Sequence, residues 1–181
     1  AAELAWAAAD ATIISWSVVT MGDQLFTDKE WGFPGSTPNA GDEIVARKVS
    51  DGSLQWRRSL PYGGNNNAQW IAWVAGARDG RVYASRSTAS GPSGAAGSPQ
   101  PITAMDAATG NTVWQSAATT VCGPYDGVVF APNGDLVVGD RLNLTRIRAT
   151  DGATVWRINR VGSVSGDCGA ALSASGAFIS D

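Results

Sequence analysis

The sequence predicts an all-β protein made of repeated four-stranded units, and three observations support this prediction. Glycine accounts for 22 of the 181 residues. Short apolar runs alternate with turn signals such as Asp-Gly and Asn-Gly, which is the pattern of short antiparallel strands. A motif that ends in tryptophan also recurs along the chain, at intervals of 42 to 58 residues.

The recurring motif reads "MDAATGNTVW" at 105–114, with glycine four residues before tryptophan. The stretches "VSDGSLQW" (49–56) and "ATDGATVW" (149–156) have the same spacing, and "AELAW" (2–6) fits it with alanine at the glycine position. Periods of this size are typical of solenoids and propellers. The motif tryptophans are Trp6, Trp56, Trp114 and Trp156.

Each unit is expected to begin with an apolar strand that turns tightly into an alternating strand. In one unit the apolar run "WIAWVAG" (70–76) precedes "DGRVYAS" (79–85), and in another "GVVFAP" (127–132) precedes "NGDLVVGD" (133–140). A run that is apolar at nearly every position fits a strand buried on both faces. The apolar strand is therefore expected to be the inner strand of the unit.

Two further strands complete each unit. A third strand, such as "ITAMDAA" (102–108), is expected to turn at Asp-Gly or Thr-Gly into a fourth that ends in tryptophan. Glycine at this turn allows a positive φ without steric cost. Four antiparallel strands in roughly 40 to 50 residues describe a blade of a β-propeller.

The stretch "AMDAATGNTVW" (104–114) resembles the Trp-docking motif of PQQ-like β-propellers, Ala-x-Asp-x-x-Thr-Gly-x-x-x-Trp. The other two copies have Lys48 and Arg148 at the Asp position. In that family the tryptophan packs between neighbouring blades, so the resemblance implies a structural role for the motif residues. They are Ala104, Asp106, Thr109, Gly110 and Trp114, and the matching Trp6, Trp56, Trp156, Gly52 and Gly152.

Residues 1–181 are expected to form one partial β-propeller, with about three complete four-stranded antiparallel blades and parts of the flanking blades. Propeller rings close with about four to eight blades, and an open arc would expose long sheet edges. We therefore expect a longer polypeptide, or a second chain, to complete the ring. The resemblance also implies a bacterial envelope protein, periplasmic or extracellular.

The connections between strands are expected to differ at the two ends of the blades. One end carries uniformly tight turns, whereas all variation in length falls at the other end, in 29–42, 57–69, 86–101 and 115–126. Binding residues usually lie on variable loops held by a rigid scaffold. We expect any partner to bind at this long-loop face.

Aromatic residues are frequent in or beside the long loops. They either form an apolar contact patch for a protein or another macromolecule, or fold under and anchor their own loops. The sequence leaves both alternatives open. These residues are Trp31, Phe33, Tyr62, Trp70 and Tyr125.

Two acidic residues and two cysteines occupy matching connections in successive blades. Asp126 and Asp167 could bind calcium, act as a general base or contribute to a surface that binds a partner. The alternative is that they cap loops by accepting hydrogen bonds from backbone N–H groups. Cys122 and Cys168 either form a disulfide between blades in an oxidising compartment or remain separate thiols.

Composition excludes several classes of function. The net charge of −3 gives no broad basic surface, so nucleic acid is not expected as a partner. The chain has no histidine, which excludes Ser-His-Asp and Cys-His catalysis by these residues. No apolar run approaches the roughly 20 residues of a membrane span.

The function expected first is a non-catalytic binding or scaffold module without a cofactor, which presents its long-loop face to a protein partner. The first alternative is a fragment of a quinoprotein alcohol or sugar dehydrogenase that uses PQQ and calcium. The second is a lactonase-type, calcium-dependent propeller hydrolase, suggested by "YDGVVFAPNGDLVVGD" (125–140).

Overall fold

The structure is a computed structural model that describes residues 6–7, 18–29, 43–60, 69–88, 99–120, 127–140, 142–160 and 170–178. The first sheet contains β1 (Val18–Met21), β2 (Gln24–Lys29), β3 (Glu43–Lys48) and β4 (Leu54–Ser59). The second contains β5 (Gln69–Arg78), β6 (Arg81–Thr88), β7 (Gln100–Asp106) and β8 (Thr112–Thr120). The third contains β9 (Val129–Phe130), β10 (Leu136–Gly139), β11 (Asn143–Ile147) and β12 (Thr154–Asn159). The final elements are β13 (Ala171–Leu172) and β14 (Ala177–Phe178).

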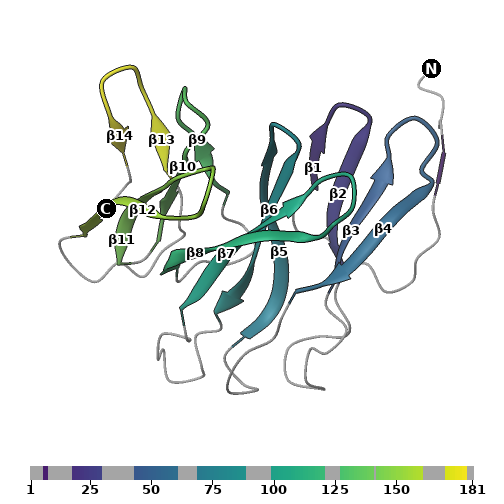
Figure 1. The fold of residues 1–181 in the computed structure, drawn as a ribbon, viewed down its shortest axis with the longest axis horizontal. Coiled ribbons are helices and arrows are strands. Elements are labelled where there is room, and N and C mark those ends of the chain that lie inside the picture. The colour runs from purple at the N-terminus through teal and green to yellow at the C-terminus, as the bar shows by residue number, and fades with distance from the viewer. Residues whose placement is uncertain are drawn as a thin grey trace.

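Each of the three sheets is antiparallel, and its strands lie in chain order. Figure 1 shows the sheets side by side along an arc, with the turns of β1–β2, β3–β4 and β5–β6 at the upper end and those of β7–β8 and β11–β12 lower, near mid-height. β13 and β14 pair with each other, and β13 contacts β9 of the third sheet. The predicted fold class, a partial β-propeller of four-stranded antiparallel blades, is confirmed.

The fourth strands are longer than the sequence pattern predicts. Tryptophan was expected to end the strand, yet β4, β8 and β12 each continue for three residues or more beyond it, to Ser59, Thr120 and Asn159. The prediction is wrong because pairing with the third strand continues to the far end of the ladder, as in Glu43↔Ser59 and Asn143↔Asn159. The first residues of the expected loops after tryptophan therefore belong to the sheets.

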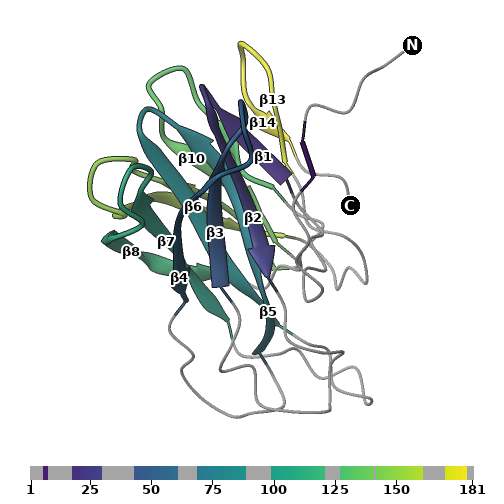
Figure 2. The ribbon, with the colours of Figure 1, turned by 90° about the vertical axis from the view of Figure 1, so that its right-hand side faces the viewer.

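The core lies between the sheets, which stack face to face in the turned view of Figure 2. Between the first and second sheets, fully buried Phe26 and Ile44 pack against Val82 and Met105. The space between the second and third sheets is filled in the same way, with large apolar residues from both. They include Trp73, Tyr83, Ile102, Trp114, Leu136 and Ile147.

Candidate functional site

The docking of one sheet on the next is the most regular arrangement of polar groups in the structure. Trp56 on β4 reaches the turn between β7 and β8, where its Nε1 donates a hydrogen bond of 2.8 Å to the backbone oxygen of Ala107. The indole lies directly on Gly110 of that turn, whose φ is +72°. A Cβ at Gly110 would lie 2.7 Å from Cδ2 of Trp56. Glycine is therefore needed here both for the backbone conformation and for the close approach of the ring.

The same arrangement occurs twice more. Trp6 donates to the oxygen of Val49 at 2.6 Å and lies on Gly52. Trp114 donates to the oxygen of Ala149 at 3.0 Å and lies on Gly152. In each case the tryptophan precedes the turn in sequence. Trp56 and Trp114 therefore lock β4 and β8 onto the following sheet, and Trp6, which lies on none of the described strands, docks on the first sheet.

A second side chain shares the acceptor at two of these contacts. Ala107 oxygen also accepts a 2.8 Å hydrogen bond from Nε2 of Gln24, the first residue of β2. Ala149 oxygen likewise accepts a hydrogen bond from Nη1 of Arg81, the first residue of β6. A carbonyl oxygen has two lone pairs, so both acceptor sites are used.

Cross-strand rows explain how the tryptophans are oriented. Phe26, Ala46 and Trp56 lie opposite one another on β2, β3 and β4. The row in the second sheet is Tyr83, Ala104 and Trp114. The small alanine lets the two aromatic rings of each row meet, with centroids 6.0 Å apart in the first sheet and 5.8 Å in the second. Such aromatic pairs add stability beyond the area that they bury.

The turns that receive the indoles are closed by aspartate in two different ways. In the second sheet, Asp106 accepts hydrogen bonds of 2.8 Å from both the backbone N–H and the hydroxyl of Thr109. These bonds hold the pKa of Asp106 below its usual value. In the first and third sheets, Asp51 and Asp151 accept from the backbone N–H two residues on.

This difference accounts for the degenerate motif copies. Lys48 and Arg148 occupy the position of Asp106, but an aspartate three residues later closes the turn in its place. Side-chain to backbone bonds of this kind stabilise turns from either position. In the third sheet Arg148 also pairs with Asp151 at 2.9 Å.

The row of the third sheet differs in composition. It consists of Val137, Arg146 and Trp156. Arg146 forms an ion pair with Asp135, with 2.8 Å between Nη2 and Oδ2, and its Nε donates to the same oxygen at 2.9 Å. Burial raises the pKa of Asp135. Hydrogen bonds from Asn133, the Ala149 N–H and Arg146 outweigh burial, so the pKa lies below its usual value.

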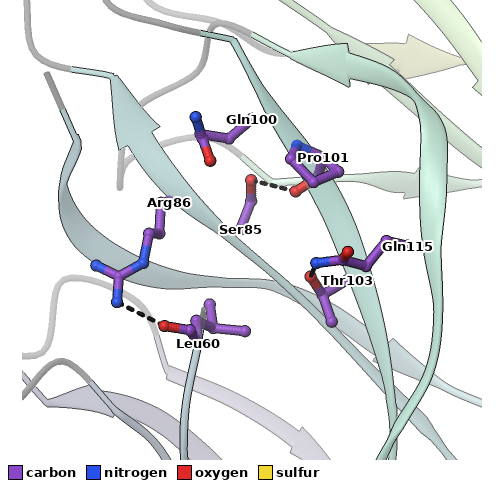
Figure 3. A pocket seen from close by; sticks show the side chains of 7 residues that line it. All are labelled: Leu60, Ser85, Arg86, Gln100, Pro101, Thr103 and Gln115. Atoms are coloured by element: carbon purple, nitrogen blue, oxygen red, sulfur yellow. Dashed lines mark hydrogen bonds between the residues drawn. The ribbon is translucent and has the colours of Figure 1, made fainter. Parts of the chain in front are cut away.

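A polar pocket lies where the end of β4 meets the second sheet (Figure 3). Its volume is about 30 Å³, which accommodates one or two water molecules. Its polar groups are engaged with one another: Arg86 donates to Leu60 oxygen at 2.7 Å, and Ser85 donates to Pro101 oxygen at 2.8 Å. Small-molecule sites are usually about ten times larger, so this pocket is a packing feature.

Comparison with known proteins gives one family match and two similar solved structures. Residues 98–176 match the family model described as outer membrane protein assembly factor BamB. The residues that this model matches carry PQQ-like β-propeller repeats. A search of the curated proteins found no match.

Among solved structures, BamB from Moraxella catarrhalis is similar with a TM-score of 0.57 and 19% identity, over 92% of this chain and 43% of that one. The computationally designed Ika4 protein is similar with a TM-score of 0.59 and 10% identity, over 96% of this chain and 88% of that one. At these identities the likeness shows the fold alone. The chain spans less than half the length of the Moraxella catarrhalis protein.

Most of the expected partner-binding residues lie outside the described part of the chain. The backbone of Trp70 lies on β5, but its side chain is not among the described ones. In the described part there is no group of three or more acidic or cysteine side chains that could hold a metal ion. The expected site residues that lie outside the described part of the chain are Trp31, Phe33, Tyr62, Cys122, Tyr125, Asp126, Asp167 and Cys168.

Sequence reasoning did not identify the residues that assist the tryptophans. Gln24, Arg81 and Arg146 all contact turn or docking groups, yet none of them belongs to the tryptophan motif. A sequence signal was present for Gln24 and Arg81, since both directly follow the tight turn after the apolar strand.

None of the described residues forms a helix that could cross a membrane.

Proposed function

We propose that this chain is part of a non-catalytic propeller scaffold in the bacterial envelope, periplasmic or extracellular, which binds a protein partner at its long-loop face. We treat residues 1–181 as one partial propeller of a larger ring. The proposal rests on one observation above all. The end of the sheets that carries the tight turns, here called the hairpin end, is already engaged in the contacts between sheets.

The engagement of the hairpin end is extensive. The indoles of Trp56 and Trp114 occupy the turns that follow β7 and β11. Arg58 donates to the oxygen of Thr109 at 2.9 Å, and Arg78 donates to the oxygen of Ala131 at 3.2 Å. Backbone oxygens at this end thus serve the contacts between sheets. At the opposite end, Arg86 and Arg157 make such contacts with the oxygens of Leu60 and Thr119 at the edges of the strands, and the connections beyond these strand ends are the part that we assign to a partner.

The opposite end has the features of a binding face. β2, β4, β6 and β8 all end there, and the connections that follow them carry the variation in length and the aromatic residues of the loops. Because the sheets are locked together, the strand ends that carry these connections are fixed before binding, which reduces the entropy lost on association. The similar protein BamB is described as an outer membrane protein assembly factor, which fits a protein as the partner.

Site-specific photo-crosslinking in cells that make the full-length protein tests this proposal. A photoreactive residue at position 31 or 62 is expected to capture one envelope protein. The matched controls are Asp79 and Asn111, which are exposed at the hairpin end. Equal capture from both ends, or none from the long-loop face, would contradict the proposal.

The captured protein then allows a measurement of affinity. Trp31→Ala and Tyr62→Ala are each expected to weaken its binding by about tenfold or more, as is typical for aromatic anchors of an interface, with an unchanged melting temperature. PQQ absorbance and stoichiometric calcium in the purified full-length protein would instead favour the dehydrogenase alternative.

A further inference from the structure

The turn between β9 and β10 contains the single Asn-Gly step of the sequence, Asn133–Gly134. An Asn-Gly step is prone to deamidation because glycine has no Cβ, so its backbone nitrogen can approach the side-chain amide of asparagine. The nitrogen of Gly134 attacks Cγ of Asn133, and a bond forms between them. The bond from Cγ to Nδ2 breaks, and ammonia leaves with the proton that the attacking nitrogen gives up. Water then opens the resulting succinimide ring to aspartate or isoaspartate.

Asn133 is exposed to solvent, but the folded turn holds the reacting groups in place. The N–H of Gly134 donates to the oxygen of Ala131 at 2.8 Å. Oδ1 of Asn133 accepts hydrogen bonds of 3.2 Å from the N–H of Asp135 and from Nη2 of Arg146, and Nδ2 donates to Oδ2 of Asp135 at 3.0 Å. The attack needs a released nitrogen on Gly134 and a side-chain amide that turns toward it. It therefore cannot occur until these hydrogen bonds break.

The product of deamidation does not fit the closed turn. A carboxylate oxygen replaces Nδ2 at the position that lies 3.0 Å from Oδ2 of Asp135. Asp135 is ionised at neutral pH, since it forms an ion pair with Arg146. A hydrogen bond thus becomes a contact between two negative charges, which repel each other at this distance. Isoaspartate also adds a side-chain carbon to the backbone path of the turn.

We propose that Asn133–Gly134 is a latent deamidation site, which the closed turn protects and which needs no co-reactant other than water once the turn opens. Arg146, on β11, is a positioning residue that keeps the turn closed. The product prevents the turn from closing again, so the reaction makes a transient opening permanent. Because the oxygen of Ala131 in this turn accepts a hydrogen bond of 3.2 Å from Arg78 of β5, deamidation also loosens the interface between the second and third sheets.

Mass spectrometry of peptides from the full-length protein measures the deamidation of Asn133 over time. We expect the reaction in the folded protein to be at least about tenfold slower than in the urea-unfolded protein, because a closed turn reacts only through its open state. Arg146→Ala is expected to accelerate it about tenfold, the effect of losing one hydrogen bond from a charged group. Hydrogen exchange of the Gly134 N–H should increase by the same factor. Arg146→Met, which keeps the apolar stem, serves where the alanine variant does not fold.

The control is Arg157→Ala, because Arg157 donates to the oxygen of Thr119 at 3.1 Å and, within the described residues, to nothing in this turn. Both rates should stay unchanged in this variant. Equal deamidation of the folded and unfolded protein would overturn the proposal. An acceleration in Arg146→Ala without faster exchange of Gly134 would also overturn it, because the reaction would then not pass through the open turn.

The effect of the product is tested with Asn133→Asp, which places the carboxylate at the same position. The matched control is Asn111→Asp in the turn between β7 and β8, since Asn111 is also exposed and its side chain makes no hydrogen bond within the described residues. We expect a lower urea midpoint and faster exchange of the Gly134 N–H for Asn133→Asp than for the control. The same midpoint and exchange in both variants would show that the product fits the closed turn, which contradicts a permanent opening.

Discussion

The two interfaces between complete sheets use one geometry with different supporting residues. In the first interface, between the first and second sheets, the carbonyl beneath the indole receives the neutral amide of Gln24. In the second interface, between the second and third sheets, it receives the charged guanidinium of Arg81. The second interface also includes a ring contact between Tyr83 and Phe130, with centroids 5.6 Å apart, and Arg78 over the ring of Phe130.

Comparing the two interfaces separates the constant groups of a docking contact from the variable ones. Both interfaces keep tryptophan, a carbonyl oxygen, and glycine with a φ of +72° or +76°. These groups are constrained by backbone conformation and by close contact, so a change in any one affects the others. The second donor and the closing aspartate only need to reach the turn, which several residue types can do from different positions.

The largest effect is expected from adding a methyl group beneath an indole. Gly110→Ala should lower the free energy of unfolding by about 2–4 kcal/mol, because it combines an unfavourable positive φ with overlap against Trp56. Urea denaturation measures the change.

Gly80→Ala is the matched control for the glycine beneath the indole. Gly80 also has a positive φ, of 75°, but a Cβ there would meet nothing within 4 Å. We expect the free energy of unfolding to fall by only about 1 kcal/mol, because only the unfavourable backbone conformation contributes. Equal losses in the two variants would show that contact with the indole does not determine the choice of glycine.

An intermediate effect is expected from the second donors, and it should differ between the interfaces. Gln24→Ala should lower the free energy of unfolding by about 1 kcal/mol and Arg81→Ala by about 2 kcal/mol, since hydrogen bonds from charged groups contribute more to stability. The urea midpoints of the two variants, compared at low and at high salt, check this expectation. A loss for Arg81→Ala no greater than that for Gln24→Ala would remove the proposed distinction.

The smallest effect is expected from the exposed turn carboxylates. The pKa values of Asp51, Asp106 and Asp151 are lowered by the hydrogen bonds that they accept. A lowered pKa in the folded state means that the stabilisation is present above the usual value, near 4, and is lost as the pH falls through the folded-state pKa.

Melting temperatures measured between about pH 5 and pH 2 test this dependence. Asp106→Asn, which keeps an oxygen acceptor for Thr109 but does not titrate, should show a smaller fall in melting temperature on acidification than the unchanged protein. A fall of the same size would mean that Asp106 does not contribute to the acid sensitivity.

Much of the fold was predictable because its signals are local. The spacing of tryptophans, the glycine before each and the paired apolar and alternating strands gave the correct number of strands in each sheet. The ends of the fourth strands were wrong, because Ser59 and Thr120 are ordered by pairing with distant residues such as Glu43 and Gln100 rather than by their own propensity. The candidate partner residues of the long loops remain predictions.

The sequence alone determined that the chain repeats a four-stranded antiparallel unit with a glycine turn and a tryptophan at constant spacing, because these features depend on neighbouring residues. Which carbonyl receives each indole depends on how the sheets pack, since Trp6, Trp56 and Trp114 lie 43, 51 and 35 residues from their acceptors. The placement of Arg146 by Asp135 also depends on the sheet, which brings these residues together across two strands. Contacts of this kind form when folded sheets stack, and no short-range pattern specifies them.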